Sequence, residues 1–336
     1  MSCQRTKILI TGASGFIGSF MVEHALKQGY ETWAALRSNS SKRYLNDENI
    51  HFIELDYSSL ANITQHLYNH KQRHGAWDII IYCAGATKCR HQQDFHTINY
   101  WGTRHFVDAL AALHITPRQF IYISTLGTYG PQHEIPPFPP ITEADTPRPN
   151  TAYGQSKRDI EVYLMSLPRF PYVIFRPTGV YGPRDKDYLM LIRSIRHHIE
   201  FLPGCHEQRI TFLHVYDLVQ AVFLAIERGV SQRTYFITDG EVYGKRDFGR
   251  IVQETLGYSL VIRIVLPLWA VQATATLCDA IGKITGNAFI LNRDKYKILS
   301  QRNWTCDITP IIRELGYHPQ YNLAKGLHQL LATPKP

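Results

Sequence analysis

Long apolar runs, paired cysteines and clusters of basic residues are all absent from this sequence of 336 residues. Its most apolar uncharged stretch, Ile264 to Cys278, contains Pro267 and is shorter than the roughly 20 apolar residues of a membrane-spanning helix. The six cysteines are scattered without a C-x-x-C pair, and the chain opens on an apolar strand instead of a signal peptide. We therefore expect a cytoplasmic protein with reduced thiols and no membrane span.

Positive charge is spread along the chain. The sequence has 36 Lys and Arg against 28 Asp and Glu, a formal net charge of +8. Because no basic run is interleaved with aromatic residues, nucleic-acid binding is not expected, and an anionic cofactor or small-molecule substrate fits the charge as well. The histidines include the pair His197-His198 and the spread around His91 and His96, and neither set has the spacing of metal ligands. We expect no metal site.

Short apolar runs alternate with segments of helical length through the first half of the chain. Six runs indicate strands, most of them too apolar to have a wet face: Lys7–Thr11, Glu31–Leu36, His51–Leu55, Asp78–Tyr82, Gln119–Ile123 and Tyr172–Phe175. The alternation predicts an α/β fold, a doubly wound parallel sheet of the Rossmann type with right-handed crossovers. Residues 131–149 carry seven prolines and are expected to form an extended loop.

The pattern changes after Pro177, where helical segments with few strands follow. We therefore predict an NAD(P)-binding domain over residues 1–177. A smaller, mostly helical substrate lobe over residues 178–336 would follow it, with a segment at about 211–238 returning to the sheet.

A glycine pattern directly follows the first apolar run. Gly12, Gly15 and Gly18 form a G-x-x-G-x-x-G motif that opens a helix extending to about Gln28. Glycine lets the backbone turn tightly and approach a pyrophosphate, whose charge the helix N-terminus stabilises. The motif predicts a dinucleotide site that includes Gly12, Ser14, Gly15, Phe16, Ile17 and Gly18.

The residues after the second and third strands bear on which dinucleotide binds. An acidic residue after the second strand would bind the ribose 2′-hydroxyl of NAD, whereas an arginine can pair with the 2′-phosphate of NADP. This chain has Arg37 there, so we favour NADP over NAD. After the third strand, Asp56 can accept a hydrogen bond from the adenine amino group or cap a helix, and Tyr57 beside it joins the predicted cofactor site.

A second set of residues combines Ser124-Thr125, at the end of the fifth strand, with Tyr153 and Lys157. Tyr153 and Lys157 are four residues apart, so on a helix they share a face and the ammonium can lower the pKa of the phenol. The spacing is not specific, since a second Y-x-x-x-K occurs at 321–325 in a predicted C-terminal helix. The order of glycine loop, Ser-Thr strand end and Tyr-Lys helix separates the two, because an open sheet binds ligands at its carboxyl edge.

Together these motifs resemble the extended short-chain dehydrogenases/reductases. This NAD-dependent epimerase/dehydratase group includes sugar-nucleotide epimerases, dihydroflavonol-type reductases and 3β-hydroxysteroid dehydrogenases. The resemblance extends from Lys7 to about Leu330 and is carried by TGASGFIG at 11–18, CAGAT at 83–87, INYWGT at 98–103, STLGTYG at 124–130, YGQSK at 153–157, RPTGVYGPRD at 176–185 and FLHVYDLVQA at 212–221. It implies an NAD(P)-dependent enzyme and a homodimer, in which helices at about 100–113 and 153–167 pair across a two-fold axis.

The resemblance also implies roles for matching residues. Tyr153 would transfer the proton, Lys157 would lower its pKa and hold the nicotinamide ribose, and Thr125 would hydrogen-bond the reacting oxygen, with Ser124 as a substitute. Asn99 matches an asparagine that supports the active-site helix, and it could equally be a local cap. Further contacts to the cofactor would come from Cys83, Ala84, Gly85, Ser124, Pro177 and Thr178.

Three functions stay open on these residues. The favoured one is hydride transfer between nicotinamide and a secondary alcohol or ketone, and the others are sugar-nucleotide epimerisation and a non-catalytic dinucleotide-binding subunit. Dehydratases of the family have an Asp-Glu pair where this chain has Leu126-Gly127, and epimerases have an asparagine where it reads RPTG at 176–179. The stretch Leu260 to Ile281 resembles the apolar helical lid of steroid-dehydrogenase-like relatives, although core packing explains an apolar helix equally well.

Overall fold

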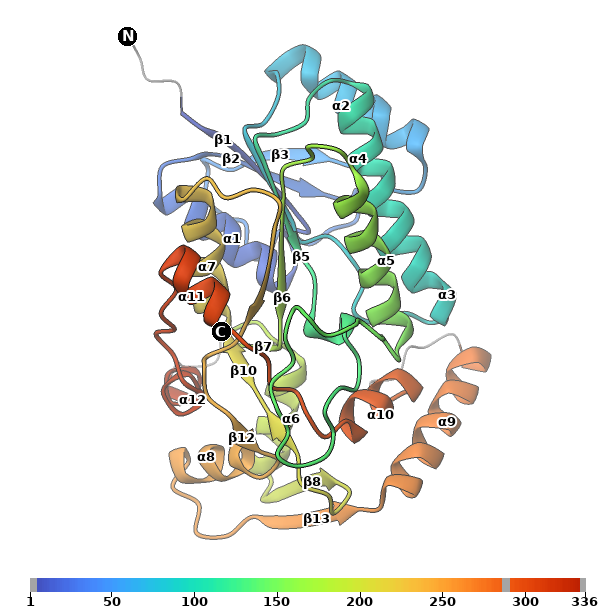
Figure 1. Cartoon of the computed structure of the whole chain (residues 1–336), viewed down its shortest axis with the longest axis vertical. Helices are drawn as coiled ribbons and strands as arrows, with labels where there is room; N and C mark the ends of the chain where they lie inside the picture. Colours follow the sequence, from blue (N-terminus) through green and yellow to red (C-terminus); the bar gives the residue numbers. More distant parts are fainter. Residues whose placement is uncertain (1–4, 286–290, 333–336) are drawn as a thin grey trace.

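The computed structural model describes residues 5–285 and 291–332, and its centre is a seven-stranded parallel sheet (Figure 1). The strands lie in the order β11-β6-β5-β4-β1-β2-β3. Their bounds are β1 Lys7–Thr11, β2 Glu31–Leu36, β3 His51–Glu54, β4 Ile79–Tyr82, β5 Gln119–Ile123, β6 Tyr172–Pro177 and β11 Arg233–Ile237. The strand order reverses between β1 and β4, which is the position where open α/β sheets bind ligands.

All six strands predicted from the apolar runs are present, with small differences at their ends. β3 ends one residue early, β4 begins at Ile79, and β6 continues to Pro177. In β1, Ile8 and Ile10 enter the core on one face of the sheet, whereas Leu9 enters the core on the other. A strand buried on both faces needs apolar residues throughout, which explains why the runs are visible in the sequence.

Helices cover both faces of this sheet (Figure 1). One face carries α1 (Phe16–Lys27), α7 (Val215–Glu227) and α11 (Thr309–Leu315), and the other carries α2 (Leu60–His74), α4 (Gly102–Ala112) and α5 (Ala152–Ser166). A short helix α3 (Gln92–Phe95) and a π-helical turn over residues 96–101 lead into α4. The predicted Rossmann doubly wound fold is confirmed.

The chain beyond β6 builds a smaller core near the carboxyl edge of the sheet, and within the described residues β11 is the one strand of this part that joins the central sheet. Tyr181, Phe212, Phe248 and Leu323 are buried in this second core. Its elements are β7 (Gly179–Tyr181), α6 (Asp187–Arg196), β8 (Ile199–Pro203), β9 (Arg209–Ile210), β10 (Phe212–His214), β12 (Tyr243–Gly244), α8 (Asp247–Thr255), β13 (Ile262–Leu266), α9 (Leu268–Thr285), α10 (Arg293–Ser300) and α12 (Leu323–Ala332).

The part of the chain after β6 is mostly helical, as predicted, and its short strands pair as three two-stranded sheets, β10-β7, β12-β9 and β13-β8. Two other expectations were wrong in detail. The stretch Leu260 to Ile281 is not one helical segment, because Ile262–Leu266 forms β13 and α9 starts at Leu268. Pro267 separates the two elements, since it has no amide hydrogen with which to continue the strand pairing. Tyr321 precedes α12, so it does not share a helical face with Lys325.

Candidate active site

The glycine motif forms a tight turn between β1 and α1, pressed against the end of β4. Gly12 has a φ of +64°, and a Cβ there would lie 2.8 Å from the amide nitrogen of Ala84. A Cβ on Gly18 would lie 2.2 Å from the carbonyl oxygen of Gly12. Both positions therefore need glycine, which leaves the backbone of the turn open to a close approach.

The start of α1 fits an anionic ligand. The first turn of the helix contains Phe16, Ile17 and Gly18, and Ser14 and Gly15 precede it. No side chain caps this turn. Amides at a helix N-terminus that lack a protein partner suit a phosphate group. The predicted pyrophosphate site is thus compatible with the local structure.

Asn99 connects the loop after β4 with the helix that carries Tyr153. Its Oδ1 accepts a hydrogen bond from the amide of Ala86 (2.7 Å), and its Nδ2 donates to the Ala86 carbonyl (3.1 Å) and to Oγ of Ser156 (3.0 Å). A Cβ on Gly85 would lie 2.9 Å from Asn99 Oδ1, so the loop over Cys83, Ala84 and Gly85 passes close above it. Asn99 is 1% exposed and acts as a bridge between two parts of the site, which goes beyond a local cap.

Tyr153 and Lys157 lie on α5, one helical turn apart. The Nζ of Lys157 donates to the carbonyl of Ile123 (2.8 Å) and lies 4.5 Å from the centre of the Tyr122 ring. The ring of Tyr153 packs edge-on against Phe95, 5.9 Å between centroids. The two residues thus lie at the carboxyl end of β5, beside the loop that Asn99 holds.

Burial determines the pKa values of this pair. It raises the pKa of Tyr153 to about 12 and lowers the pKa of Lys157 to about 8, because each charged form loses solvation. The expected lowering of the phenol's pKa by the ammonium is therefore not present in the chain alone. The physical reason is the loss of solvation of the buried phenolate, while the ammonium of Lys157 donates to the Ile123 carbonyl.

The hydroxyl groups of Thr125 and Ser124 have different surroundings. Oγ1 of Thr125 accepts from the amide of Gly127 (3.1 Å), and its own hydrogen has no acceptor among the residues that the structure describes. The hydroxyl of Ser124 donates to the carboxylate of Glu161, which is fully buried. Ser124 would have to give up this buried bond before it could substitute for Thr125, and the roles of both hydroxyl groups stay predictions.

A buried ion pair behind Ser124 was not predicted from the sequence. The guanidinium of Arg176, 3% exposed, donates to both oxygens of Glu161 over 3.0–3.2 Å. It also lies over the ring of Tyr129, 5.2 Å from its centre. The available signal in the sequence was a charged residue, Arg176, directly after the apolar run at 172–175, but the sequence does not show its partner. The pair holds β6 against α5.

Pro177 ends β6, and the hydroxyl of the following Thr178 donates to the carbonyl of Thr211 (2.9 Å). Thr211 in turn donates to the carbonyl of Trp304 (2.6 Å). Thr178 is therefore committed to a structural hydrogen bond within the stretch 176–179 that stands where epimerases of the family have an asparagine.

The residues predicted to bind the adenosine part lie after β2 and β3. Arg37 is exposed, and its guanidinium has no hydrogen bond or ion pair within residues 5–285 and 291–332, the described parts of the chain. Both oxygens of Asp56 are occupied, by the amide of Ser58 (2.9 Å) and Nδ2 of Asn62 (2.6 Å), and these bonds lower the pKa of Asp56. The ring of Tyr57 packs against Tyr82 and Phe106 in the core.

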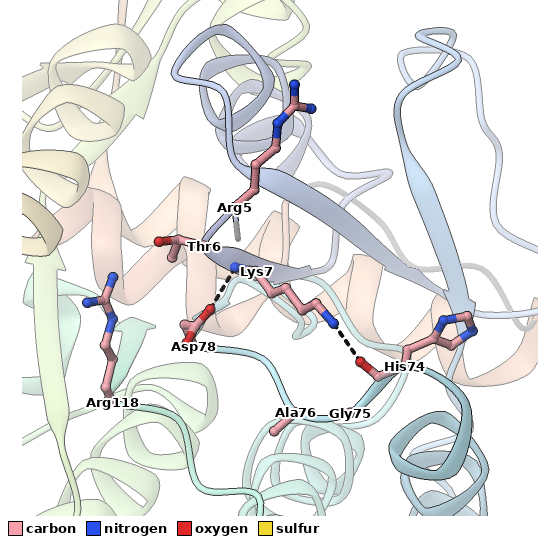
Figure 2. A pocket seen from close by; sticks show the side chains of 8 residues that line it. All are labelled: Arg5, Thr6, Lys7, His74, Gly75, Ala76, Asp78 and Arg118. Atoms are coloured by element: carbon pink, nitrogen blue, oxygen red, sulfur yellow. Dashed lines mark hydrogen bonds between the residues drawn. The ribbon is translucent and has the colours of Figure 1, made fainter. Parts of the chain in front are cut away.

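A cavity of about 340 Å³ at the opposite edge of the sheet contains none of the predicted site residues (Figure 2). It lies where β1, β4 and β5 begin, with Lys7, Asp78 and Arg118 among its lining residues. Lys7 donates from Nζ to the carbonyl of His74 (2.6 Å) and from its amide to Asp78 (2.8 Å). This cavity is therefore separate from the candidate site, whose residues lie at the carboxyl edge of the sheet.

Comparison with known proteins places the chain in a family. The model of the NAD dependent epimerase/dehydratase family matches residues 8–238. The chain therefore belongs to this family, within the extended short-chain dehydrogenases/reductases, and it is an enzyme. None of the helices in the described ranges has the length and apolar character needed to cross a membrane.

Two curated relatives match over nearly their whole lengths. A ketoreductase of Stigmatella aurantiaca acting on 4-hydroxy-2-methyl-3-oxo-4-farnesyl-3,4-dihydroquinoline-1-oxide is 25% identical, over 96% of this chain and 95% of the relative. The decarboxylating sterol-4-alpha-carboxylate 3-dehydrogenase of Dictyostelium discoideum is 24% identical, over 96% and 99%. Among solved structures, UDP-glucose 4-epimerase of Thermotoga maritima aligns with a TM-score of 0.77 at 22% identity, over 97% of each chain, which supports the fold.

Removal of the buried carboxylate should destabilise the protein strongly. We expect Glu161→Ala to lower the free energy of unfolding by about 3–5 kcal/mol, because it removes the fully buried partner of Arg176 and leaves that guanidinium only the exposed carboxylate of Glu143, 3.7 Å away. The matched control is Glu254→Ala, which breaks an exposed ion pair with Arg250 and should cost at most about 1 kcal/mol. Urea denaturation measures both. Equal stability of the two variants would contradict the role given to Glu161.

Proposed function

We propose that the enzyme is an NAD(P)-dependent oxidoreductase that interconverts a secondary alcohol and a ketone, with Tyr153 as general acid and base. The observation that carries this proposal is the position of Tyr153 and Lys157 on one face of α5, beside Gly85 and the glycine turn. A Cβ on Gly85 would lie 3.7 Å from Nζ of Lys157. This proximity supports a nucleotide site and a proton-transferring group at the same edge of the sheet.

Each residue then has a role that its surroundings support. When bound, the nicotinamide supplies or accepts the hydride. Tyr153 gives its proton to the ketone oxygen during reduction, or takes the proton of the alcohol during oxidation. Thr125 has a hydroxyl hydrogen to donate to the same oxygen, Lys157 would bind the nicotinamide ribose, and Asn99 keeps the two segments in register. The main chain of residues 83–85 and Pro177 would border the ring.

Several features favour net oxidation or reduction over epimerisation. This chain reads RPTG at 176–179, where epimerases of the family have an asparagine, and the hydroxyl of Thr178 is already bound to Thr211. Leu126-Gly127 lacks the acid-base pair of dehydratases, which argues separately against loss of water. Two of the curated relatives that match over nearly their whole lengths are named as a ketoreductase and a dehydrogenase, of a farnesylated quinoline oxide and a sterol carboxylate. We therefore propose a lipophilic secondary alcohol or ketone as substrate. Exposed apolar side chains on α9, such as Trp269 (74% exposed), are consistent with this class.

We also propose NADP as the preferred cofactor and the cytoplasm as the location. Arg37 lies directly after β2 without a protein partner, so it is free to pair with a 2′-phosphate. The five cysteines in the described ranges are all free, as expected for a reducing compartment.

A cofactor titration tests the role of Arg37. We expect Arg37→Ala to raise the Kd for NADP on the order of tenfold or more, since a charge-assisted contact to phosphate is lost, and to change the Kd for NAD less than about twofold. Arg43→Ala is the control, because that guanidinium already lies 5.5 Å from the centre of the Tyr44 ring. Tighter binding of NAD than NADP in both the parent protein and the Arg37 variant would contradict the assignment.

We propose a homodimer in which α4, with the turn just before it, and α5 pair with the same helices of a second chain. Trp101, Val162 and Met165 are exposed on these segments, an arrangement that suits a two-fold helix pairing. Light scattering at micromolar concentration should give twice the 38.7 kDa of one chain. Val162→Arg should give a single chain, whereas Tyr68→Arg on exposed α2 should not alter the mass. A parent protein that scatters as one chain would contradict the dimer.

A turnover screen tests the proposed reaction itself. The protein is incubated with oxidised or reduced NADP or NAD and with panels of lipophilic secondary alcohols, ketones, and UDP- or GDP-sugars. We expect a net change in reduced nicotinamide with an alcohol or ketone. Conversion of a sugar nucleotide without net change of the cofactor would instead assign the enzyme as an epimerase.

Tyr153→Phe is the matched variant for this screen. It keeps the ring and its packing against Phe95, so cofactor binding should stay near normal while turnover falls on the order of a thousandfold. Turnover within about threefold of the parent enzyme would remove Tyr153 from the mechanism.

A further inference from the structure

The first turn of α5, which carries Tyr153, is capped by the preceding residue Thr151 and by Asp294, which is far away in the sequence. Oγ1 of Thr151 accepts from the amide of Gly154 (3.0 Å), as a local cap does. The amides of Ala152 and Tyr153 donate instead to Oδ2 of Asp294, at 2.9 and 3.4 Å. The first turn of α5 contains no acidic residue of its own, so Asp294 supplies the negative charge that favours a helix N-terminus.

Asp294 is held firmly in this position. It is 8% exposed and lies on α10, and its second oxygen accepts from Nε2 of Gln92 on α3 (3.4 Å). Nearby, Nζ of Lys297 donates to the carbonyl of Asn150, just before α5 (2.6 Å). The carboxylate therefore links α3, α5 and α10, and α3 is the helix whose Phe95 contacts the Tyr153 ring.

The contact also connects the tyrosine to the part of the chain that would cover a substrate. The amide of Arg293 donates to Asp279 on α9 (3.2 Å), so α10 is attached to α9 at its first residue. Figure 1 shows α9 and α10 side by side at the edge of the molecule next to the start of α5. A displacement of α9 can therefore reach the backbone of Tyr153 through Arg293 and Asp294, the first two residues of α10.

We infer that Asp294 is a positioning residue for the reaction, which holds the backbone of Tyr153 and thereby the direction of its phenol. The inference rests on the proposed role of Tyr153 as acid and base. A proton donor must be placed to within a fraction of an ångström, and a misplacement of about 1 Å can cost a factor of about 100 in rate. Asp294 would act on kcat through Tyr153, without touching substrate or cofactor itself.

Three variants separate positioning from stability. Asp294→Ala removes the acceptor, and we expect kcat to fall between about tenfold and a hundredfold while the Kd for the cofactor changes less than about twofold. Asp294→Asn keeps an oxygen acceptor and should retain kcat within about threefold. Asn292→Ala removes the cap of α10 itself, whose Oδ1 accepts from the amide of Lys295 (2.8 Å), and should lower stability with little loss of kcat.

Hydrogen exchange of the segment 150–157 gives a second reading that needs no turnover. Exchange should be faster in Asp294→Ala than in the parent and Asp294→Asn proteins, because the amides of Ala152 and Tyr153 lose their acceptor. Unchanged exchange, or an equal loss of kcat in Asn292→Ala, would overturn the inference. If the parent enzyme converts no alcohol or ketone, the proposed function fails separately, and the exchange result alone decides whether Asp294 holds Tyr153.

Discussion

The pairing of β1 with β4, which joins the two halves of the central sheet, is extended by one side-chain hydrogen bond at the edge where the candidate site lies. Oγ1 of Thr11, the last residue of β1, accepts from the amide of Ala84, just after β4 (3.1 Å). It holds the glycine turn against the β4 loop, and from that loop Asn99 continues the connection to Ser156 on α5. The predicted nucleotide turn and the helix of Tyr153 are therefore parts of one hydrogen-bonded structure, although they lie over a hundred positions apart in the sequence.

Burial gives this structure its chemical character. With a pKa of about 12, Tyr153 keeps its proton at neutral pH, which suits the donor needed to reduce a ketone. Lys157, with a pKa of about 8, is still mostly protonated at neutral pH but close to losing its charge. In the proposed reaction, reduction uses the protonated phenol and oxidation uses the phenolate, so charge brought by a bound cofactor would shift the pKa values of both groups.

The sequence was most informative where structure is local or repeated. Strands buried on both faces show as apolar runs, and the glycine spacing at 12–18 predicts a turn that the positive φ of Gly12 confirms. The contacts of Glu161 with Arg176 and of Asp294 with Ala152 join residues 15 and 142 positions apart, and no periodicity predicts such pairs. The strand β13 was missed because an apolar run before α9 fits a helix as well as a strand.

A crystal structure with NADP bound would test the account most directly. We predict the pyrophosphate at the turn from Gly12 to Gly18, the 2′-phosphate next to Arg37, and Nζ of Lys157 within hydrogen-bond distance of the nicotinamide ribose, with the Tyr153 hydroxyl facing the same space. A nucleotide bound elsewhere, or a Tyr153 hydroxyl directed away from the nicotinamide, would contradict the proposed reaction.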